Sequence, residues 1–293
     1  MRLFDEKFGA QFLDGVPSRP GVYRFYDAAG GLLYVGKAKD LRRRLGQYRT
    51  AGRKKHERKR FALVKTAARI AWEICESELA AALMEVRLIQ TLSPRRNVAS
   101  AFPFLYPFVG IHIHERETYF CLTTSPAAFP DFEFHGAFRS REVTGEAFFS
   151  LVRLLRFVGH PVPRHRCRQF GTAAHSYVRG FRRLPPEVSE RWPRLLEGAS
   201  REALESLAVR LLEHAGARAK RAEVQEDFRA MTRFFEEEAS ELARARAATA
   251  YPIYPVPQAE RDLLFVRYRQ KPFSRHHLPT AAALEKRASQ ENK

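Results

Sequence analysis

The chain has 293 residues, of which 45% are hydrophobic, and this is enough for one large domain or two to three small ones with buried cores. Its 51 Lys and Arg against 33 Asp and Glu give a formal net charge of +18, which suits a polyanion better than a small neutral metabolite, with nucleic acid as the first candidate and an anionic membrane as the second. No signal peptide or membrane span is visible, and the three cysteines lie far apart without a CxxC pattern, so we expect a cytoplasmic protein without disulfides.

The first predicted elements form a β-hairpin. Residues 21–26 and 32–36 are rich in Val, Leu, Tyr and Phe, and the turn-forming stretch DAAGG separates them. Because side chains alternate along a strand, Tyr23 and Tyr34 could meet on one surface of this hairpin. Asp40 is a good N-cap for a short basic helix that follows, over residues 41–48.

A third strand at 69–75 and a helix at 78–92 complete the first unit. Ser77 can cap this helix, which ends before Pro94. It is apolar around most of its circumference, so we expect it to be largely buried, with Glu85 in its middle. Residues 1–98 contain 21 Lys and Arg against 10 Asp and Glu, so more than half of the excess positive charge lies in the first third of the chain.

The sequence of the remaining two thirds of the chain predicts further strands, an amphipathic helix and a helical hairpin with Gly216 at its turn. The segment 159–186 is basic and loop-like; its three histidines and single cysteine are more simply solvated or core residues than metal ligands. The tail contains one strand-like stretch, LLFVRY, and then a polar end that we expect to fray. In chain order, the predicted elements are strands at 103–115, 118–124 and 131–138, a helix at 144–158, helices at 201–216 and 220–246, and the strand-like 263–268.

The side chains around the hairpin could hydrolyse a phosphodiester. That reaction needs an activated water, stabilisation of negative charge in the transition state and, in most cases, a metal ion. A tyrosine, with a reference pKa near 10, is a poor base at neutral pH unless cations such as Lys37 and Arg44 favour its phenolate or it relays a proton. A lone carboxylate in an apolar helix is costly to bury without a partner, which makes Glu85 the best candidate ligand for Mg²⁺.

Each of these residues also has a simpler explanation. Tyrosines are common in strands, the lysines and arginines could form a solvated face, and Glu78 and Glu85 could share an exposed stripe. The run RKKHERKR at 53–60 could contact phosphates or only be solvated. The individual signals therefore decide little when each is taken alone.

Together, however, four motifs resemble the GIY-YIG nuclease domain, in the version found in UvrC and its short homologue Cho. The resemblance covers about residues 14–98 and implies a mixed α/β (α+β) fold, with a three-stranded antiparallel sheet flanked by helices. In order along the chain, the motifs are GVY at 21–23, YVGKAKDLRRRL at 34–45, LMEVRLIQ at 83–90 and PRRN at 94–97.

This resemblance implies an endonuclease that cuts DNA. Tyr34 would prepare the attacking water, with Tyr23 as the alternative, and Lys37 and Arg44 would hold and neutralise the scissile phosphate.

The resemblance also implies one divalent metal ion, Mg²⁺ or Mn²⁺, held by Glu85. Tyr48 and Asn97 would support the site. The remaining basic residues of this region are the expected contacts to the DNA backbone, namely Lys39, Arg42, Arg43, Arg53, Lys54 and Lys55.

Downstream, FHGAFRSREVTGEAFFSLVRLLRF is similar to the segment that follows the UvrC nuclease domain. Of the cysteine-rich region that comes next in UvrC, only Cys167 is present, and AEVQEDFRAM is at best a degenerate form of the UvrB-binding consensus. We therefore expect a nuclease domain at 14–98, a UvrC-like middle region at 99–186, a helical region at 187–250 with a UVR-like hairpin, and a tail at 251–293.

The implied function is a Cho-like 3′-side incision of damaged duplex DNA during nucleotide excision repair, with a UvrB-type protein as the implied protein partner. Two alternatives remain open at this stage. The chain could be a non-catalytic DNA-binding adaptor that kept the fold, or a nuclease of the same fold that acts on branched or mobile-element DNA.

Overall fold

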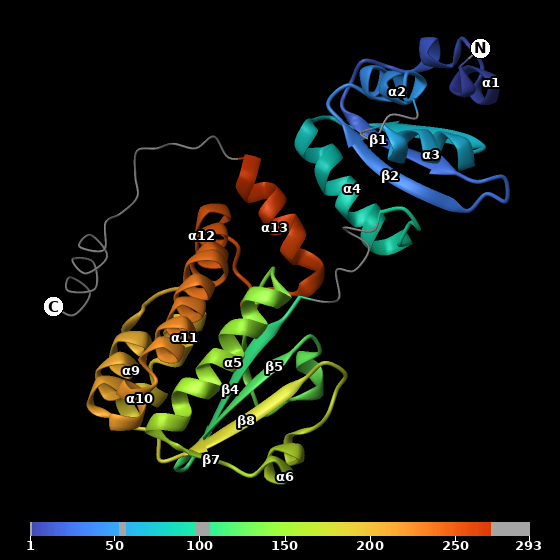
Figure 1. The fold of residues 1–293 in the computed structure, drawn as a ribbon. Coiled ribbons are helices and arrows are strands. Elements are labelled where there is room, and N and C mark those ends of the chain that lie inside the picture. Colours follow the sequence, from blue (N-terminus) through green and yellow to red (C-terminus); the bar gives the residue numbers. More distant parts are fainter. Residues whose placement is uncertain (1, 53–56, 98–105, 271–293) are drawn as a thin grey trace.

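The structure is a computed structural model that describes residues 2–52, 57–97 and 106–270. The chain forms an N-terminal lobe (residues 2–97) and a C-terminal lobe (residues 106–270), which lie at opposite ends of the molecule and approach each other at helices α4 and α13 (Figure 1). Three of the predicted DNA contacts, Arg53, Lys54 and Lys55, fall outside the described ranges.

The N-terminal lobe contains the predicted three-stranded antiparallel sheet, in the order β2-β1-β3. Its strands are β1 (Gly21–Tyr26), β2 (Leu32–Ala38) and β3 (Arg69–Ile74). Its helices are α1 (Leu3–Phe8), the short 3₁₀ helix η1 (Phe12–Gly15), α2 (Leu41–Arg49), α3 (Arg58–Thr66) and α4 (Glu78–Leu92).

Local side-chain hydrogen bonds explain where these elements begin and end. The Asp27 carboxylate accepts from the backbone N–H groups of Ala29 and Gly31 and so closes the hairpin turn, in which Gly30 has a φ of +81°. Asp40 accepts from the Arg43 N–H at the start of α2, and Ser77 accepts from the Ala80 N–H at the start of α4. The predicted caps are confirmed.

Both faces of this sheet are covered. Tyr23 and Phe25 point into a core shared with α1, α2 and α3, whereas Val22 and Val35 point to the opposite face, against α4. The prediction that α4 is largely buried was wrong. Only Ala81, Ala82 and Ile89 of this helix are buried, and its other residues are half-buried or exposed. The half-buried group includes Glu85.

The C-terminal lobe contains a five-stranded antiparallel sheet in the order β6-β4-β5-β8-β7. Its strands are β4 (Phe108–His114), β5 (Glu117–Thr123), β6 (Glu133–His135), β7 (His160–Pro161) and β8 (Tyr177–Arg182). The helices that accompany the sheet are η3 (Pro126–Ala128), α5 (Arg141–Val158), α6 (Arg164–Cys167), η4 (Arg168–Phe170), α7 (Pro186–Ser189) and α8 (Trp192–Leu196). The C-terminal helices are α9 (Glu202–Glu213), α10 (Ala215–Ala219), α11 (Arg221–Phe234), the π-helical turn η5 (Phe235–Ala239), α12 (Ser240–Thr249) and α13 (Gln258–Gln270).

Two sequence predictions for this lobe were wrong. The segment 159–186, expected to be a loop, contains β8, an interior strand that pairs with β5 and β7. The strand-like 263–268 lies within a helix, α13, because Leu264, Phe265 and Tyr268 follow the i, i+1, i+4 spacing of a helical face. Gly216 lies in the connection between the hairpin helices α9 and α11, as predicted, although this connection is itself the short helix α10.

One hydrophobic core unites the sheet with the C-terminal helices. It runs from Val109 and Phe120 on the strands, through Phe148 of α5 and Trp192 of α8, to Leu264 of α13. Two polar contacts fix the helices to each other: Arg153 of α5 binds the carboxylate of Asp227 on α11, and Glu238 accepts from the backbone N–H groups that begin α5. The middle and helical regions of the chain therefore share one interior.

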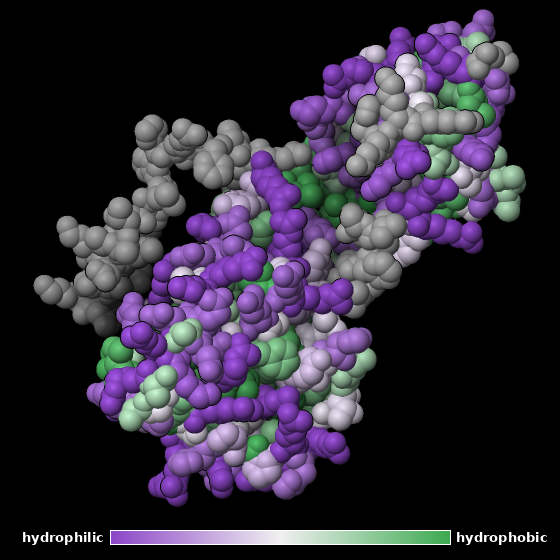
Figure 2. Space-filling model, in the orientation of Figure 1, coloured by the Kyte–Doolittle hydropathy of each residue, from purple (hydrophilic) through white to green (hydrophobic). Residues whose placement is uncertain are grey.

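Helix α13 contacts both lobes. In the C-terminal lobe the buried Arg261 donates to the carbonyl of Ala137 and lies over the ring of Tyr106, whose hydroxyl donates to Asp262. Towards the N-terminal lobe, the side chain of Gln90 on α4 donates to the carbonyl of Ala259. The face shown in Figure 2 is mostly hydrophilic, with hydrophobic residues gathered where α4 and α13 meet. No helix within the described ranges is both long and apolar enough to cross a membrane.

His135, at the end of β6, gives the C-terminal lobe a pH-dependent stability. The ring is fully buried, its Nδ1 lies 3.0 Å from the Tyr254 hydroxyl, and within the described residues its Nε2 has no hydrogen-bond partner. Burial lowers the pKa of His135 to about 4. Between that value and the ordinary pKa near 6.5, the unfolded chain binds more protons than the folded chain.

We therefore expect the contribution of His135 to stability to be complete above pH ~6.5 and to be lost, by at most about 1.4 kcal/mol per pH unit, as the pH falls towards the folded-state value. Chemical denaturation across this range should show a shallower pH dependence for His135→Phe than for the parent. The matched control is His160→Phe, because His160 is exposed. Equal slopes for the parent and His135→Phe would contradict this assignment.

Candidate active site

The predicted tyrosines meet on one face of the β1–β2 hairpin. Tyr34 lies opposite Phe25 and Tyr23 lies opposite Gly36, so the two phenol rings are diagonal neighbours with centroids 6.1 Å apart. A β-bulge between Phe25 and Tyr26 shifts the register at the turn end of the hairpin.

Gly36 leaves room for the ring of Tyr23. A Cβ atom at position 36 would lie 2.5 Å from both the Cζ and the hydroxyl of Tyr23, and 2.8 Å from the ring of Tyr34. Any side chain here would push the two phenols out of place. The glycine after the second tyrosine is therefore required by space and not by backbone conformation.

Helix α2 supplies a guanidinium and a third phenol to this pair. The Tyr23 and Tyr48 hydroxyl oxygens are 3.0 Å apart, and Arg44 Nε donates to the Tyr23 hydroxyl at 3.1 Å. A second guanidinium nitrogen of Arg44 donates to Gln47 Oε1, which holds the arginine against its own helix. The structure thus brings together Tyr23, Tyr34, Arg44 and Tyr48.

Burial keeps these phenols protonated at neutral pH. It is the main cause of the raised pKa of each tyrosine: the pKa values of Tyr23 and Tyr34 lie well above the ordinary value of 10, and that of Tyr48 is about 12. The positive charge of Arg44 lowers all three pKa values, but by less than burial raises them. The expectation that nearby cations favour the phenolate is therefore not met in this structure, and proton relay by a neutral phenol fits it better.

Glu85 reaches this site from α4 on the other side of β2. Its Oε1 accepts a hydrogen bond from the backbone N–H of Lys37 at 3.0 Å. Burial raises the pKa of the Glu85 carboxyl, although that hydrogen bond and the charges of Lys37 and Arg44 oppose the rise. The carboxylate is thus fixed in position while its charge is only partly compensated.

This geometry is compatible with a hard divalent cation. The described residues contain no cluster of three or more His, Cys, Asp or Glu that could surround a metal ion. An ion at Glu85 would therefore have one protein carboxylate and would complete its shell with water or phosphate oxygens, which is the usual arrangement for Mg²⁺.

Asn97 closes the outer edge of β2. Its Oδ1 accepts from the Val35 N–H at 2.9 Å and its Nδ2 donates to the Val35 carbonyl at 2.8 Å, so one side chain satisfies both backbone groups of Val35. The backbone N–H of Arg96 donates to the carbonyl of Leu33 beside it. The chain that follows α4 is in this way held along β2 much as a further strand would be.

A cleft of about 970 Å³ opens between these elements. Tyr34, Arg44, Tyr48, Glu85 and Asn97 all line it, whereas the fully buried Tyr23 does not. Five further cations line the cleft that were not named among the expected DNA contacts, although the basic run at 53–60, considered as a possible phosphate contact, and the motif PRRN contain them. They are Arg58, Lys59 and Arg60 at the start of α3, and Arg95 and Arg96 after α4.

Three of the predicted DNA contacts, Lys39, Arg42 and Arg43, do not line this cleft. Lys39 forms an ion pair with Glu78 at 2.7 Å, and Arg42 donates to the carbonyls of Asp14 and Val16. Arg43 is exposed on α2. Contact of these three residues with DNA remains a prediction.

Comparison with known proteins identifies the N-terminal domain. A model of the UvrC-like GIY-YIG domain matches residues 19–98. Residues 19–98 are a UvrC-like GIY-YIG domain.

Among curated proteins, the UvrABC system protein C of Proteus mirabilis is 45% identical over 107 residues, and that of Yersinia pseudotuberculosis is 42% identical over 113 residues. These matches cover 36% and 39% of this chain but only 17% and 18% of the relatives, so the similarity concerns less than a fifth of their length. Among solved structures, the GIY-YIG N-terminal endonuclease domain of UvrC from Thermotoga maritima, bound to magnesium as its catalytic divalent cation, is 30% identical. That match covers 31% of this chain and 97% of the Thermotoga domain, with a TM-score of 0.28.

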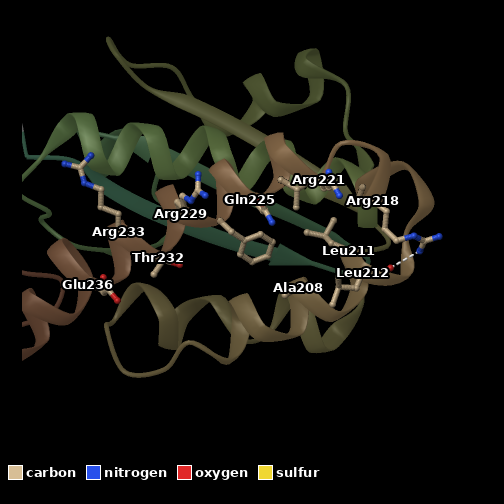
Figure 3. A pocket seen from close by; sticks show the side chains of 13 residues that line it. Ala208, Leu211, Leu212, Arg218, Arg221, Gln225, Arg229, Thr232, Arg233 and Glu236 are labelled. Carbon is tan, nitrogen blue, oxygen red and sulfur yellow. Dashed lines mark hydrogen bonds between the residues drawn. The ribbon is translucent and has the colours of Figure 1, made fainter.

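A second groove, of about 910 Å³, lies between α9 and α11 in the C-terminal lobe. Figure 3 shows Ala208 and Leu212 of α9 on one side of it and Arg229 and Thr232 of α11 on the other. Phe228 lies among the residues that line it, and Leu212 is 70% exposed. This groove contains apolar contact surface and arginines but no catalytic arrangement.

The Asn97 side chain should stabilise the GIY-YIG domain. Asn97→Ala leaves the N–H and C=O of the buried Val35 without partners, so we expect the free energy of unfolding to fall by about 1–3 kcal/mol. Denaturant titration measures this loss, and the amide of Val35 should exchange its hydrogen faster. The control is Arg95→Ala, an exposed neighbour. If both variants unfold alike, the edge contact contributes little.

Proposed function

We propose that this chain is a metal-dependent DNA endonuclease of the UvrC and Cho type. The observation that supports this most directly is that Tyr34, Arg44 and Glu85, which come from three different elements, line a single cation-rich cleft. Phosphodiester hydrolysis needs proton transfer, charge neutralisation and, in most cases, a metal ion, and a phenol, a guanidinium and a carboxylate can supply these functions.

Tyr34 is the better candidate for handling the proton of the attacking water. It lines the cleft, whereas Tyr23 is fully buried and hydrogen-bonded to Tyr48 and Arg44. The water oxygen would bond to phosphorus as the bond to the 3′ oxygen breaks. Tyr34 would accept the water proton while it releases its own phenolic proton to solvent. The departing 3′ oxygen would take a proton from solvent, so the products would carry 3′-hydroxyl and 5′-phosphate ends.

Glu85 would hold one Mg²⁺ or Mn²⁺ ion, which when bound supplies charge stabilisation at the scissile phosphate and the leaving oxygen. The remaining positive charge comes from the protein. Arg44 lies in the cleft, Lys37 lies beside Glu85, and the basic residues at 58–60 and 95–96 line the walls. These cations would bind the backbone of the cut strand on both sides of the reacting phosphate.

The substrate and pathway are part of the same proposal. The curated relatives are components of the UvrABC system, which supports action on damaged duplex DNA in nucleotide excision repair, within the cytoplasm. As with Cho, the proposed incision lies on the 3′ side of the lesion.

The cutting assay uses Mg²⁺ and a labelled duplex already nicked on the 5′ side of a bulky lesion. Glu85→Gln keeps an oxygen that can accept from the Lys37 N–H but removes the charge, and Tyr34→Phe removes the hydroxyl, so we expect each to slow cutting at least about 100-fold. Arg87→Gln, an exposed change on the same helix, is the control and should cut like the parent. If Glu85→Gln or Tyr34→Phe cuts at the parent rate, that residue's assignment is wrong. DNA binding without any cutting by the parent would favour the adaptor.

A UvrB-type protein is the partner that we propose for the C-terminal lobe. The α9–α11 groove supports this, because its apolar lining and exposed Leu212 could accept a helix of another protein. Leu212→Glu should weaken a complex with such a partner at least about 10-fold in a titration, since a charge would have to be buried. Val209→Glu is the control, because Val209 is exposed on the same helix but lies outside the groove. Equal affinities would exclude the groove as the binding site.

A further inference from the structure

The C-terminal lobe carries a stretch of unusual charge. Residues 156–183 contain no Asp or Glu in 28 positions. All seven basic charges in this stretch are arginines, namely Arg156, Arg164, Arg166, Arg168, Arg179, Arg182 and Arg183. The nuclease site and the α9–α11 groove use none of them.

This stretch folds into one edge of the five-stranded sheet. It runs from the end of α5 through β7 and α6 to β8, and β7 pairs with only Phe181 and Arg182 of β8. The Val162 N–H donates to the carbonyl of Gly180, which places the start of α6 beside the middle of β8. Figure 1 shows this edge on the side of the C-terminal lobe far from the nuclease domain, and the visible surface there is largely hydrophilic (Figure 2).

Three of these arginines, Arg156, Arg164 and Arg179, come from elements that contact one another. Arg164 follows Val162, which is hydrogen-bonded to Gly180 beside Arg179, and helix α5, which carries Arg156, contacts β8. The charge of Arg166 is neutralised by Glu117, because two guanidinium nitrogens of Arg166 donate to the two carboxylate oxygens of Glu117. In contrast, within the described part of the chain no carboxylate lies within 4 Å of Arg156, Arg164 or Arg179. Partial burial and the like charges of Arg164 and Arg156 lower the pKa of Arg179.

Such a cluster is unfavourable in the free protein. Like charges repel each other, and the half-buried Arg179 has only the carbonyl of its neighbour Val178 as a hydrogen-bond acceptor among the described residues. A polyanion would relieve the repulsion, and guanidinium groups bind phosphate oxygens through two parallel hydrogen bonds. Tyr177, which is 39% exposed and lies two residues before Arg179, adds an aromatic surface on the same face of β8.

We propose that Arg156, Arg164 and Arg179 form a second binding site for the nucleic-acid backbone, separate from the nuclease cleft. The choice of nucleic acid over another polyanion rests on the proposed function, since the same chain carries a GIY-YIG domain. In this arrangement the nuclease cleft contacts the phosphates near the cut, and the arginine edge of the C-terminal lobe contacts a more distant part of the backbone.

The test measures binding of a labelled DNA duplex by fluorescence anisotropy at several salt concentrations in EDTA, where metal-dependent cutting cannot interfere. For the full chain with R156Q, R164Q and R179Q combined, the negative slope of log affinity against log salt should become smaller in magnitude by about 2–3, because each lost phosphate contact removes ~0.9. The matched control removes three arginines that already have acidic partners and lie outside the α9–α11 groove, through R201Q, R210Q and R244Q. It changes the net charge equally and should leave the slope nearly at the parent value.

Each outcome has a definite meaning. Equal slopes for the two triple variants would overturn the second site. The site would also be overturned if the variant with R156Q, R164Q and R179Q lost affinity for phosphatidylserine vesicles but not for DNA. If circular dichroism shows that the combined variant does not fold, the three single substitutions replace it. Each should reduce the magnitude of the slope by about 0.9. A reduced slope in a protein that never cuts DNA would support this site while contradicting the proposed function.

Discussion

The outer edge of β2 is the constraint on which the nuclease domain depends. As the edge strand of a three-stranded sheet, β2 would leave backbone groups of Leu33, Val35 and Lys37 without partners. Two later parts of the chain satisfy them: Glu85 binds the N–H of Lys37, and the Arg96–Asn97 segment binds Leu33 and Val35. The hydrogen bond that positions Glu85 is thus one of the hydrogen bonds that satisfy the free edge of β2. The position of the candidate metal ligand therefore depends on the backbone of a strand.

The same closeness of packing decides the chemistry. Because Tyr23 and Tyr48 are buried and share a hydrogen bond, their phenols stay neutral, and the charge of Arg44 serves to orient Tyr23 rather than to ionise it. Tyr34 is less buried and lines the cleft, so of the three phenols it has the best access to a water molecule. Burial and exposure therefore divide the three tyrosines between support of the site and contact with the reaction.

The sequence predicts the N-terminal lobe well because its signals are local. Asp40 and Ser77 are caps, the turn is closed by a nearby Asp, and the motifs follow one another at short range. Prediction from the sequence failed where an element depends on contacts with residues far away in the chain. Strand β8 has arginines at two of its six positions and so lacks a plain hydrophobic pattern, although its pairing with β5 makes it an interior strand. Besides Arg44, the five cations that line the cleft lie in two motifs that are far apart in the sequence, and only the folded chain brings them to one cleft.

Helix α13 connects the N-terminal lobe with the C-terminal lobe. Its Arg261 is held inside the C-terminal lobe by the Ala137 carbonyl, while its Ala259 carbonyl accepts from Gln90, five residues beyond Glu85 on α4. The helix that carries the candidate metal ligand is therefore in contact with the lobe that carries the arginine edge. If both surfaces bind one nucleic acid, α13 helps to set the distance between the cut and the second contact. Arg261 in its first turn is then as important as the apolar face of the helix, because removing this residue would loosen the helix from the sheet end that it joins.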